Sequence, residues 1–582
     1  MPRLGENLKL NLVSVGLALP FILNYHRNPS PSAFQQAATW LAWAGLLWLL
    51  PSFSWRAAAM QVRQALHLLA ALALAVLGSW AVLDIPAAYT LATLGFLGSA
   101  GVLVCAGAGL AGSTELSKIF AVFCRGLILA GMFNAGVSLL QVYQPALLDG
   151  VLMGQSVLPG RAVGNLRQPN HLAYLLLWSL LATAMLYQLG QLQRIWAWSM
   201  SAVLMSAMVL SASRTGLLGV LLLAGWVAVD GSVGAKARRV LLLSPLLFLV
   251  AWGASVWWAQ STGAELAAQS RVAQGLASPP RWLLIRDAWT LISEHPWFGV
   301  GWGEFNFAWT LTPMASRSGQ HFDHTHNLVL QWVVELGVPV ALLLLGLSAR
   351  LFWSAGRQSR RIAAAAPQAS LGQIQRAAWA GACLMIVPSL LEYPLWYVYF
   401  LFPMVWMVGI SLAANRAPSV SSGTSSLPAL PGILAGVFLL TALWLCSDIR
   451  KAQQVFDPMN EGEWAPLQER LDLGRSSVFY PYTAHHMGAT RLSPRPEALR
   501  DAESAAHGLI DTWLLQAWAN SLHAAGQDEK ARYLVQRLLE FKDKRGQKMM
   551  APCLDPELAK TAYQCTLPPP GLSHVDFRKM RL

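Results

Sequence analysis

Long apolar stretches recur along the chain between residues 10 and 447, and short polar segments separate them. A helix needs about 20 apolar residues to cross a bilayer, so each stretch near this length predicts a membrane-spanning helix. The pattern predicts an all-α polytopic membrane protein with about 12–13 transmembrane helices. The first stretch lacks a small-residue cleavage site, so we expect it to remain as the first membrane helix. The predicted spans are 10–23, 38–50, 65–83, 89–110, 119–143, 170–189, 195–212, 215–229, 240–258, 327–349, 377–391, 395–413 and 428–447.

The pattern changes towards the C-terminus. Residues 417–428 are rich in Ser and Pro, which predicts a flexible connection before the last span. Residues 448–582 have the composition of a soluble helical domain, whereas we expect residues 1–447, including a long outer loop over 259–326, to form a transmembrane domain that holds any catalytic site. Between residues 507 and 541 apolar positions recur at helical spacing with a break near Gly526, which resembles a single tetratricopeptide repeat. Such a domain is either a small helical cap or a docking platform for a protein substrate.

Composition excludes a soluble enzyme, because 12% of the residues are charged and 55% are hydrophobic, whereas soluble domains carry about 25% charged residues. Residues 1–447 hold 24 Lys and Arg against 12 Asp and Glu, a net +12, while the remaining residues hold 18 against 17, a net +1. A basic excess in a membrane protein is usually loop charge that sets orientation against anionic lipid. We therefore expect a lipid bilayer as partner and no nucleic acid.

The charge pattern also predicts orientation. With the N-terminus in the cytoplasm, the inner loops hold fifteen basic residues and the outer loops hold eight, in agreement with the positive-inside rule. An odd number of spans then places the C-terminal domain outside; in a Gram-negative cell this means that the spans cross the inner membrane and the domain lies in the periplasm. In that compartment Cys553 and Cys565 could form a disulfide or stay reduced. The six cysteines show no metal-ligand clustering.

The outer loops combine arginines and histidines with few carboxylates. Residues 259–326 contain only scattered acidic residues, whereas a divalent cation that holds a diphosphate commonly needs two carboxylates close together. Arginine can replace a metal in this role, because its guanidinium binds phosphate oxygens bidentately and stays charged. The sequence therefore predicts no metal and no cofactor, and a site that stabilises the charge on a leaving diphosphate.

The densest polar cluster is residues 323–328, with sequence Asp-His-Thr-His-Asn-Leu, at the start of the predicted span 327–349. Histidine at a membrane–water boundary can act as a base near neutral pH, so His326 is a candidate to deprotonate an acceptor hydroxyl. Two other interpretations stay open: the cluster could cap and anchor the helix at the interface, or His324 and His326 could bind zinc, for which further ligands are lacking.

A second cluster, residues 164–171, precedes the span 170–189, and its Asn170 and His171 could cap the helix or bind sugar. Arg214 lies between two spans with almost no loop, where an arginine is unfavourable unless it is paired or faces a polar cavity. Arg281 and Arg286 lie on one candidate helix, five residues apart and so on somewhat different faces. A solvated loop charge remains the alternative for Arg286.

These segments together resemble the O-antigen ligase and polymerase superfamily, and more closely its protein O-oligosaccharyltransferase branch, which glycosylates pilins. Leu-Pro-Phe at 19–21, followed by His26 and two prolines, resembles the outer-side segment of that branch. Residues 164–173 resemble its Gly…Gln-Pro-Asn element, residues 213–216 its Ser-Arg element, and residues 281–305 its Arg…Trp…Pro-x-x-Gly-x-Gly segment.

The superfamily's ligases share His-Asn followed after nine residues by Gly, and His326, Asn327 and Gly337 match this pattern. Val340 departs from the small or hydroxylic residue that the ligases prefer at that position, which favours a cousin of the lipopolysaccharide ligase. The helical C-terminal domain is also similar to the domain appended in the protein-glycosylating branch.

The resemblance implies a metal-independent, inverting glycosyltransferase. Its donor would be an undecaprenyl-diphosphate-linked oligosaccharide, transferred en bloc, and its acceptor a Ser or Thr hydroxyl of a periplasmic protein such as a type IV pilin. His326 would be the base, and Arg214 and Arg281 would bind the diphosphate. Candidates for donor binding are Arg161, Arg286, Gln168, Asn170, His171 and His324.

Two alternatives remain open at this point. The first keeps the chemistry but uses a glycan acceptor, as in an O-antigen ligase or polymerase. The second is a transporter or lipid flippase, for which ionisable residues belong at mid-membrane. Most polar groups here gather at the outer ends of spans, and Glu335 and Glu392 are the main exceptions.

Overall fold

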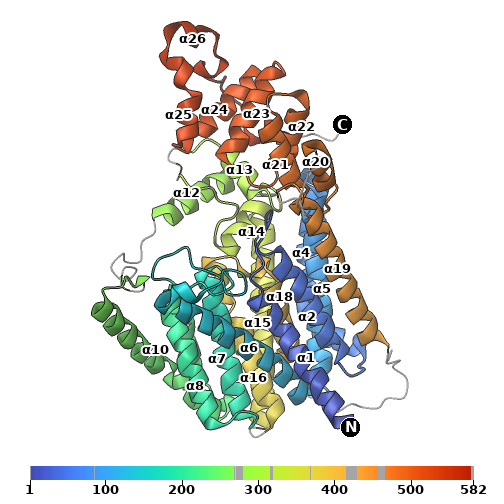
Figure 1. Cartoon of the computed structure of the whole chain (residues 1–582). Helices are drawn as coiled ribbons and strands as arrows, with labels where there is room; N and C mark the ends of the chain where they lie inside the picture. The colour runs from blue at the N-terminus through green and yellow to red at the C-terminus, as the bar shows by residue number, and fades with distance from the viewer. Residues whose placement is uncertain are drawn as a thin grey trace.

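The computed structural model describes residues 2–83, 85–267, 269, 279–314, 317, 319–366, 369–414, 429–456 and 466–578. Throughout these residues the regular elements are helices, and no β-strand occurs in them. The predicted linker 417–428 lies outside the described residues. Figure 1 shows an elongated molecule in which a bundle of long helices carries a group of shorter C-terminal helices at one end, here called the upper end.

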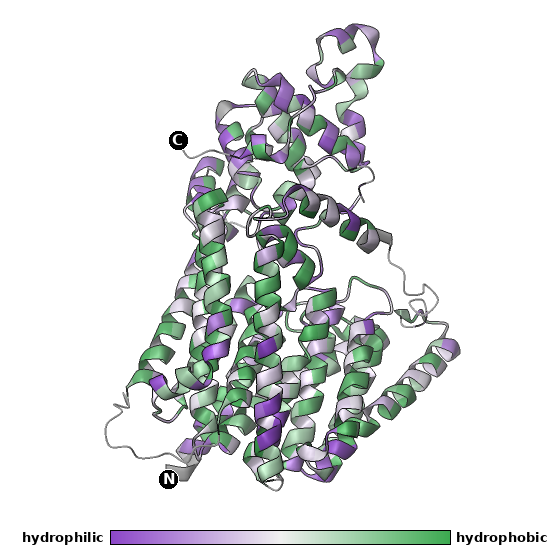
Figure 2. Ribbon diagram, turned by 180° about the vertical axis from the view of Figure 1, so that it is seen from behind, coloured by the Kyte–Doolittle hydropathy of each residue, from purple (hydrophilic) through white to green (hydrophobic). Residues whose placement is uncertain are grey.

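The bundle is built from helices that match the apolar stretches of the sequence. Their bounds are α1 (Pro2–Ile22), α2 (Ala33–Trp48), α3 (Trp55–Gln61), α4 (Arg63–Leu83), α5 (Ala87–Ala111), α6 (Leu116–Tyr143), α7 (Pro169–Gln188), α8 (Arg194–Ser211), α9 (Arg214–Val229), α10 (Ala235–Thr262), α14 (Leu328–Leu336), α15 (Val338–Ala365), α16 (Ser370–Cys383), α17 (Ile386–Leu391), α18 (Val398–Leu412) and α19 (Leu430–Gln453). Figure 2 shows that hydrophobic residues dominate these helices, while the upper helices are more hydrophilic.

Within the described part of the chain, nine helical segments are long and apolar enough to cross a membrane: α4, α5, α6, α7, α8, α10, α15, α16 together with α17, and α19. Helices α9 and α18 are apolar but shorter. The prediction of an all-α polytopic membrane protein is confirmed, and fewer helices meet this length and composition test than the sequence pattern predicted.

Two of the predicted spans are each divided into two helices. The stretch 327–349 forms two helices, because α14 ends at Gly337, whose φ of +81° does not continue a helix. Helix α15 starts directly after it and runs to Ala365, well beyond the predicted end. The stretch 377–391 also divides, into α16 and α17, and its helix begins earlier, at Ser370.

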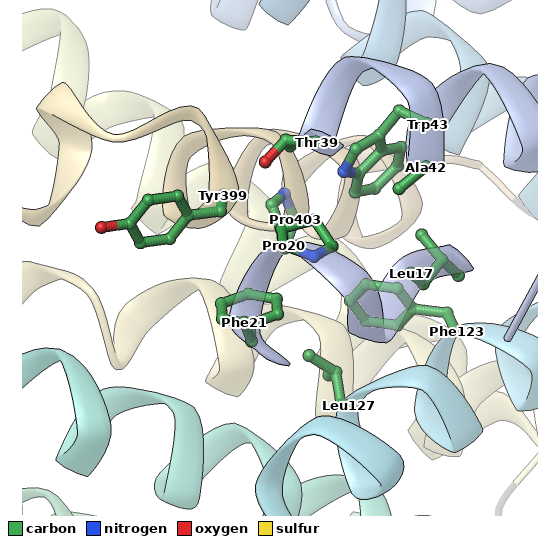
Figure 3. A pocket seen from close by; sticks show the side chains of 10 residues that line it. All are labelled: Leu17, Pro20, Phe21, Thr39, Ala42, Trp43, Phe123, Leu127, Tyr399 and Pro403. Atoms are coloured by element: carbon green, nitrogen blue, oxygen red, sulfur yellow. The ribbon is translucent and has the colours of Figure 1, made fainter. Parts of the chain in front are cut away.

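Helices α1, α2, α6 and α18 pack closely around a small pocket of about 10 Å³, which has room for no more than one water molecule. Figure 3 shows Pro20 of α1 beside Pro403 of α18 in this pocket, with Trp43 of α2 lining the same space. Tyr399 lies at its edge, and its hydroxyl is directed away from Trp43. This packing holds α18 in place and directs Tyr399 towards His171, whose Nδ1 lies 3.2 Å from the Tyr399 hydroxyl.

The upper helices are called the C-terminal unit here, residues 466–578. They are α20 (Leu467–Arg475), α21 (Pro481–Leu492), α22 (Pro496–Ala505), α23 (Thr512–Ala524), α24 (Asp528–Glu540), α25 (Lys544–Met549) and α26 (Pro556–Thr561). The predicted helix–turn–helix is present as α23 and α24, joined at Gly526, which has a φ of +74°. Cys553 and Cys565 form a disulfide with a Cα–Cα distance of 5.3 Å.

The C-terminal unit shares its hydrophobic core with the long loop that precedes α14. Helices α12 (Pro279–Glu294) and α13 (Phe305–Leu311) of this loop contribute buried residues to one cluster with α22, α23 and α24. The Tyr533 hydroxyl donates to the carbonyl of Leu311 at 2.6 Å, and Arg317 pairs with Glu540 at 3.0 Å. The division expected from the sequence, with the loop in the membrane domain, therefore separates residues that the structure packs together.

Candidate active site

Three helices begin close to one another at the upper end of the bundle, and each has a polar side chain as its N-cap. Gln168 of α7 accepts from the backbone amides of residues 170 and 171, Ser213 of α9 accepts from Gly216, and Asn327 of α14 accepts from Leu330. A capping side chain satisfies amides that a helix start otherwise leaves unpaired. The helix starts also carry partial positive charge, which favours an anion in their vicinity.

Hydrogen bonds connect the three helix starts through Glu392, which directly follows α17. Nδ1 of His326 lies 2.8 Å from Oε2 of Glu392, and Nδ2 of Asn170 donates to Oε1 of the same carboxylate at 2.9 Å. The hydroxyl of Ser213 donates to Oδ1 of Asn170 at 2.8 Å. The chain His326–Glu392–Asn170–Ser213 thus ends beside Arg214, the first residue of α9.

This arrangement suits a histidine base. A carboxylate only accepts hydrogen bonds, so its contact with Nδ1 requires the proton to be on that nitrogen and leaves Nε2 to take a proton from another group. Glu392 is 5% exposed, so its charge is little screened by water and can stabilise the imidazolium that forms when His326 takes a proton.

The backbone is strained next to each of the three helix starts. His326, Arg167 and Ala212 have φ values of +54°, +55° and +50°, and they are three of the four non-glycine residues with positive φ among the described residues. Each lies two residues before the first residue of a helix. Residues held in such conformations cluster at functional sites, where the surrounding structure maintains them.

A layer of aromatic rings lies behind His326. The rings of His324 and Tyr393 are 3.3 Å apart between centroids, and those of His324 and His326 are 4.4 Å apart. Tyr397 continues the layer to His171, at 4.7 Å. Burial lowers the pKa of His324 in spite of its contact with the Asp323 carboxylate, so its ring tends to stay neutral. His171 is 4% exposed, which places it in the support of the site and away from its surface.

The arginines differ in how they are held. Arg214 is exposed at the start of α9, and Arg161 donates from Nε to the carbonyl of Ser211 at 2.9 Å, beside the turn that leads to Arg214. Arg286 pairs with its neighbour Asp287 on α12 at 2.9 Å. Arg281 lies on the same helix, but its side chain is outside the described residues.

Two glycines explain why α12 and α14 are held together. After α12 the chain crosses the junction of α14 and α15, with hydrogen bonds from the amide of Val300 to the carbonyl of Val334 and from Val338 to Pro296, both 2.8 Å. A Cβ on Gly337 would lie 2.3 Å from the carbonyl oxygen of Trp297, and one on Gly299 would lie 2.4 Å from backbone atoms of Glu335. We call this crossing the glycine crossing. The crossing brings together glycines from two of the segments that resemble the family: Gly299 of residues 281–305, and Gly337 of the His-Asn…Gly pattern.

A cavity of about 720 Å³ lies next to the His326–Glu392 pair. Leu328 and Leu390, each two residues from one member of the pair, line it, and helices α4, α5, α15 and α18 form most of its apolar wall. Tyr482 and Leu509 of the C-terminal unit also contribute. The cavity therefore extends from the membrane helices to the C-terminal unit and is large enough to hold part of a lipid chain.

Sequence reasoning missed the role of Glu392 in the site, although its position in an apolar region marked it as unusual. Its partner His326 is 66 residues away along the chain, so no local pattern indicates the pair. In the sequence, Ser213 stands out only as part of the Ser-Arg element at residues 213–216. Across the described residues, no group of three or more His, Cys, Asp and Glu side chains is placed to hold a metal ion.

Comparison with known proteins covers both the site and the C-terminal unit. Residues 174–345 match the family described as O-antigen ligase. Residues 376–548 match the family described as the C-terminal part of a virulence factor membrane-bound polymerase. The first match contains His326 and Arg214, and the second contains Glu392 and most of the C-terminal unit.

Two relatives come from Acinetobacter baylyi. The chain is 24% identical to a general O-oligosaccharyltransferase over 398 residues. This aligned region covers 64% of this chain and 65% of the relative. It is also 24% identical to a ComP-specific O-oligosaccharyltransferase over 314 residues, a region that covers 51% of this chain and 53% of the relative. The matched region is thus less than two thirds of each relative's length.

Proposed function

We propose that this chain is a member of the O-antigen ligase superfamily, whose family models it matches over residues 174–345 and 376–548, and that it is a membrane glycosyltransferase. It moves an oligosaccharide from a polyprenyl diphosphate, such as undecaprenyl diphosphate, to a hydroxyl group of a protein. The acceptor is a Ser or Thr of a periplasmic, pilin-like protein, and the membrane is the bacterial inner membrane with the upper end in the periplasm. The disulfide in the C-terminal unit supports this orientation, because disulfides persist in oxidising compartments.

The observation that carries the proposal is the hydrogen-bonded chain from His326 through Glu392 and Asn170 to Ser213, beside Arg214. Nε2 of His326 takes the proton of the acceptor hydroxyl while its oxygen attacks the anomeric carbon of the donor sugar. The bond from that carbon to the diphosphate oxygen breaks, and attack from the opposite face inverts the anomeric centre. Glu392 stabilises the imidazolium that results.

The leaving group is the polyprenyl diphosphate. Arg214 binds its phosphate oxygens, assisted by Arg281 and by the helix starts of α7 and α9, and this stabilises the charge that grows as the bond breaks. Arg161 positions the turn that carries Arg214 through its contact with the Ser211 carbonyl. The polyprenyl chain enters the cavity of about 720 Å³ from the bilayer.

The test uses a bacterium that makes a lipid-linked oligosaccharide and a candidate pilin but has no glycosylating ligase of its own. The intact mass of the pilin should rise by one glycan with the wild-type chain and stay unchanged with His326→Ala or Arg214→Ala. His523→Ala is a matched control, because this histidine lies in the C-terminal unit and pairs with Asp528, far along the chain from the site. Loss of glycosylation in all three variants would point to damaged folding instead.

A second candidate function is transfer to a glycan acceptor, because the two matched families are described as a ligase and a polymerase. The same cells distinguish the two functions. A pilin of unchanged mass, together with lipopolysaccharide or polymer whose length depends on His326, would assign a glycan acceptor and leave the donor chemistry in place.

A further inference from the structure

We infer that one face of α12 binds sugars of the donor oligosaccharide beyond the one that is attacked. This inference rests on the proposed function. The face consists of Trp282, Ile285, Arg286 and Trp289, and it is called the α12 tryptophan face. It lies on the loop that the glycine crossing fixes to α14, the helix that begins next to His326.

Helix α12 carries large apolar residues on both of its sides. Leu284, Ala288 and Leu291 are buried in the core shared with the C-terminal unit. On the opposite side Trp282 and Trp289 are 70% and 68% exposed. Tryptophan is usually well buried, so two highly exposed indoles on one face indicate a surface that binds a ligand.

The spacing places the two indoles on the same face of α12, one above the other. Residues 282 and 289 are seven apart, which is nearly two helical turns, so their side chains lie on the same face about 10 Å apart along the axis. Ile285 lies between them and is 45% exposed. Two flat rings at this separation can contact different sugars of one oligosaccharide.

The composition of the face favours a glycan over lipid. Arg286 lies within the stripe between the two indoles and pairs with Asp287. Asp287 itself is buried on the core side of the helix, so a face inserted into a bilayer would carry the half-exposed guanidinium of Arg286 with it, which is unfavourable. A sugar can bind both the indoles and the Arg286 guanidinium. The C–H groups of a pyranose ring pack on an indole, while its hydroxyls can hydrogen-bond to a guanidinium.

The helix that carries the face packs, on its other side, into the same core as residues near His326. Leu284 and Leu291 of α12 share one hydrophobic cluster with Phe322 and Val334, which lie on either side of His326 in sequence. After α12 the chain reaches the glycine crossing within a few residues, and Trp297 there is 69% exposed. In the inferred binding mode, the glycan of the donor extends from the site beside His326 along this loop.

The experiment compares two donors that carry undecaprenyl diphosphate, one with a single N-acetylhexosamine and one with a trisaccharide. In the pilin assay, Trp282→Leu and Trp289→Leu should raise the KM for the trisaccharide donor by about tenfold and leave the KM for the monosaccharide donor unchanged. Trp282→Tyr and Trp289→Tyr keep an aromatic ring and should restore most of the affinity. Trp257→Leu is the control, because this residue is 71% exposed on the membrane helix α10.

The results separate the possible ligands. Equal changes for both donors, or full activity with Leu but not with Tyr, would assign the face to lipid and overturn the proposal. If the wild type transfers neither donor, the proposed function fails, and saturation-transfer NMR with the free trisaccharide then tests the face alone. Signals that vanish in the Leu variants and persist in the Tyr variants would support it, and absent signals in the wild type would overturn it.

Discussion

Replacement of Glu392 by Gln tests the chemistry most directly. The change keeps the shape of the side chain, and its carbonyl oxygen can still accept the 2.9 Å hydrogen bond from Asn170. It removes the negative charge that faces Nδ1 of His326 at 2.8 Å. Because the lost charge acts mainly on His326 in the transition state, we expect kcat to fall by a larger factor than the KM for the donor rises.

The magnitude follows from the burial of the pair. A hydrogen bond to a charged group contributes about 1.5–3 kcal/mol, and Glu392 is 5% exposed, so solvent weakens this contact little. The benefit arises mainly when His326 becomes charged in the transition state. Each 1.36 kcal/mol changes a rate by a factor of ten, so kcat should fall by about ten- to 150-fold.

The assay is the initial rate of pilin glycosylation with purified protein at saturating and limiting donor. Asp448→Asn is the matched control, because Asp448 is also buried, at 1% exposed, and takes its hydrogen bonds from Ser477 and the amides of Val478 and Phe479. A wild-type kcat in Glu392→Gln would refute the reasoning. Equal losses in both variants would also do so, because they would trace the effect to folding.

Three further predictions concern the donor, the backbone and pH. Arg214→Lys keeps the charge but loses the bidentate fork, so the donor KM should rise by about tenfold, and a wild-type KM would exclude a forked contact. Gly337→Ala should lower stability by roughly 1–3 kcal/mol in thermal unfolding, because its φ is +81° and the new Cβ would lie 2.3 Å from the Trp297 carbonyl oxygen. Gly346→Ala, in α15 with open space around its Cβ, should raise the melting temperature slightly, and a loss as large as that of Gly337→Ala would contradict the steric argument. Burial lowers the pKa of His574 from 6.5 to about 3. Below pH 6.5 the unfolded chain therefore binds a proton that the folded chain does not, so stability is fully present above this pH and falls by roughly 1.4 kcal/mol per pH unit on acidification. Melting curves of His574→Gln between about pH 7 and pH 4 should show a weaker pH dependence, and an unchanged slope would assign the effect to other groups.

The helices of the bundle could be predicted because a bilayer imposes one simple requirement, a long apolar stretch, on each of them. The break at Gly337 could not, since the residues on both sides are apolar and the stretch reads as one span. What ends α14 there is the crossing of a segment about 40 residues earlier in the chain. Contacts of this kind depend on how the chain folds back, and hydropathy does not contain them.

The candidate site is likewise only partly predictable from the sequence. His326 and Asn170 stand out in the sequence because polar residues are rare next to apolar stretches, and the structure places both on the carboxylate of Glu392. Nothing near Glu392 in the sequence indicates its partners. The position of His171 is also a tertiary property: sequence reasoning offered it as a donor-binding residue, and the ring is buried against Tyr397 and Phe400.

The C-terminal unit takes part in holding the site, and this follows from where its core lies. Helix α14 is short and could not keep His326 at a strained φ of +54° on its own. It is held by the glycine crossing at one end and by a core that α12 and α13 share with α22, α23 and α24. The outer loop and the C-terminal unit therefore form one packed support for His326. In the proposed function, an acceptor protein that binds to this support meets residues packed in the same core as those that flank His326.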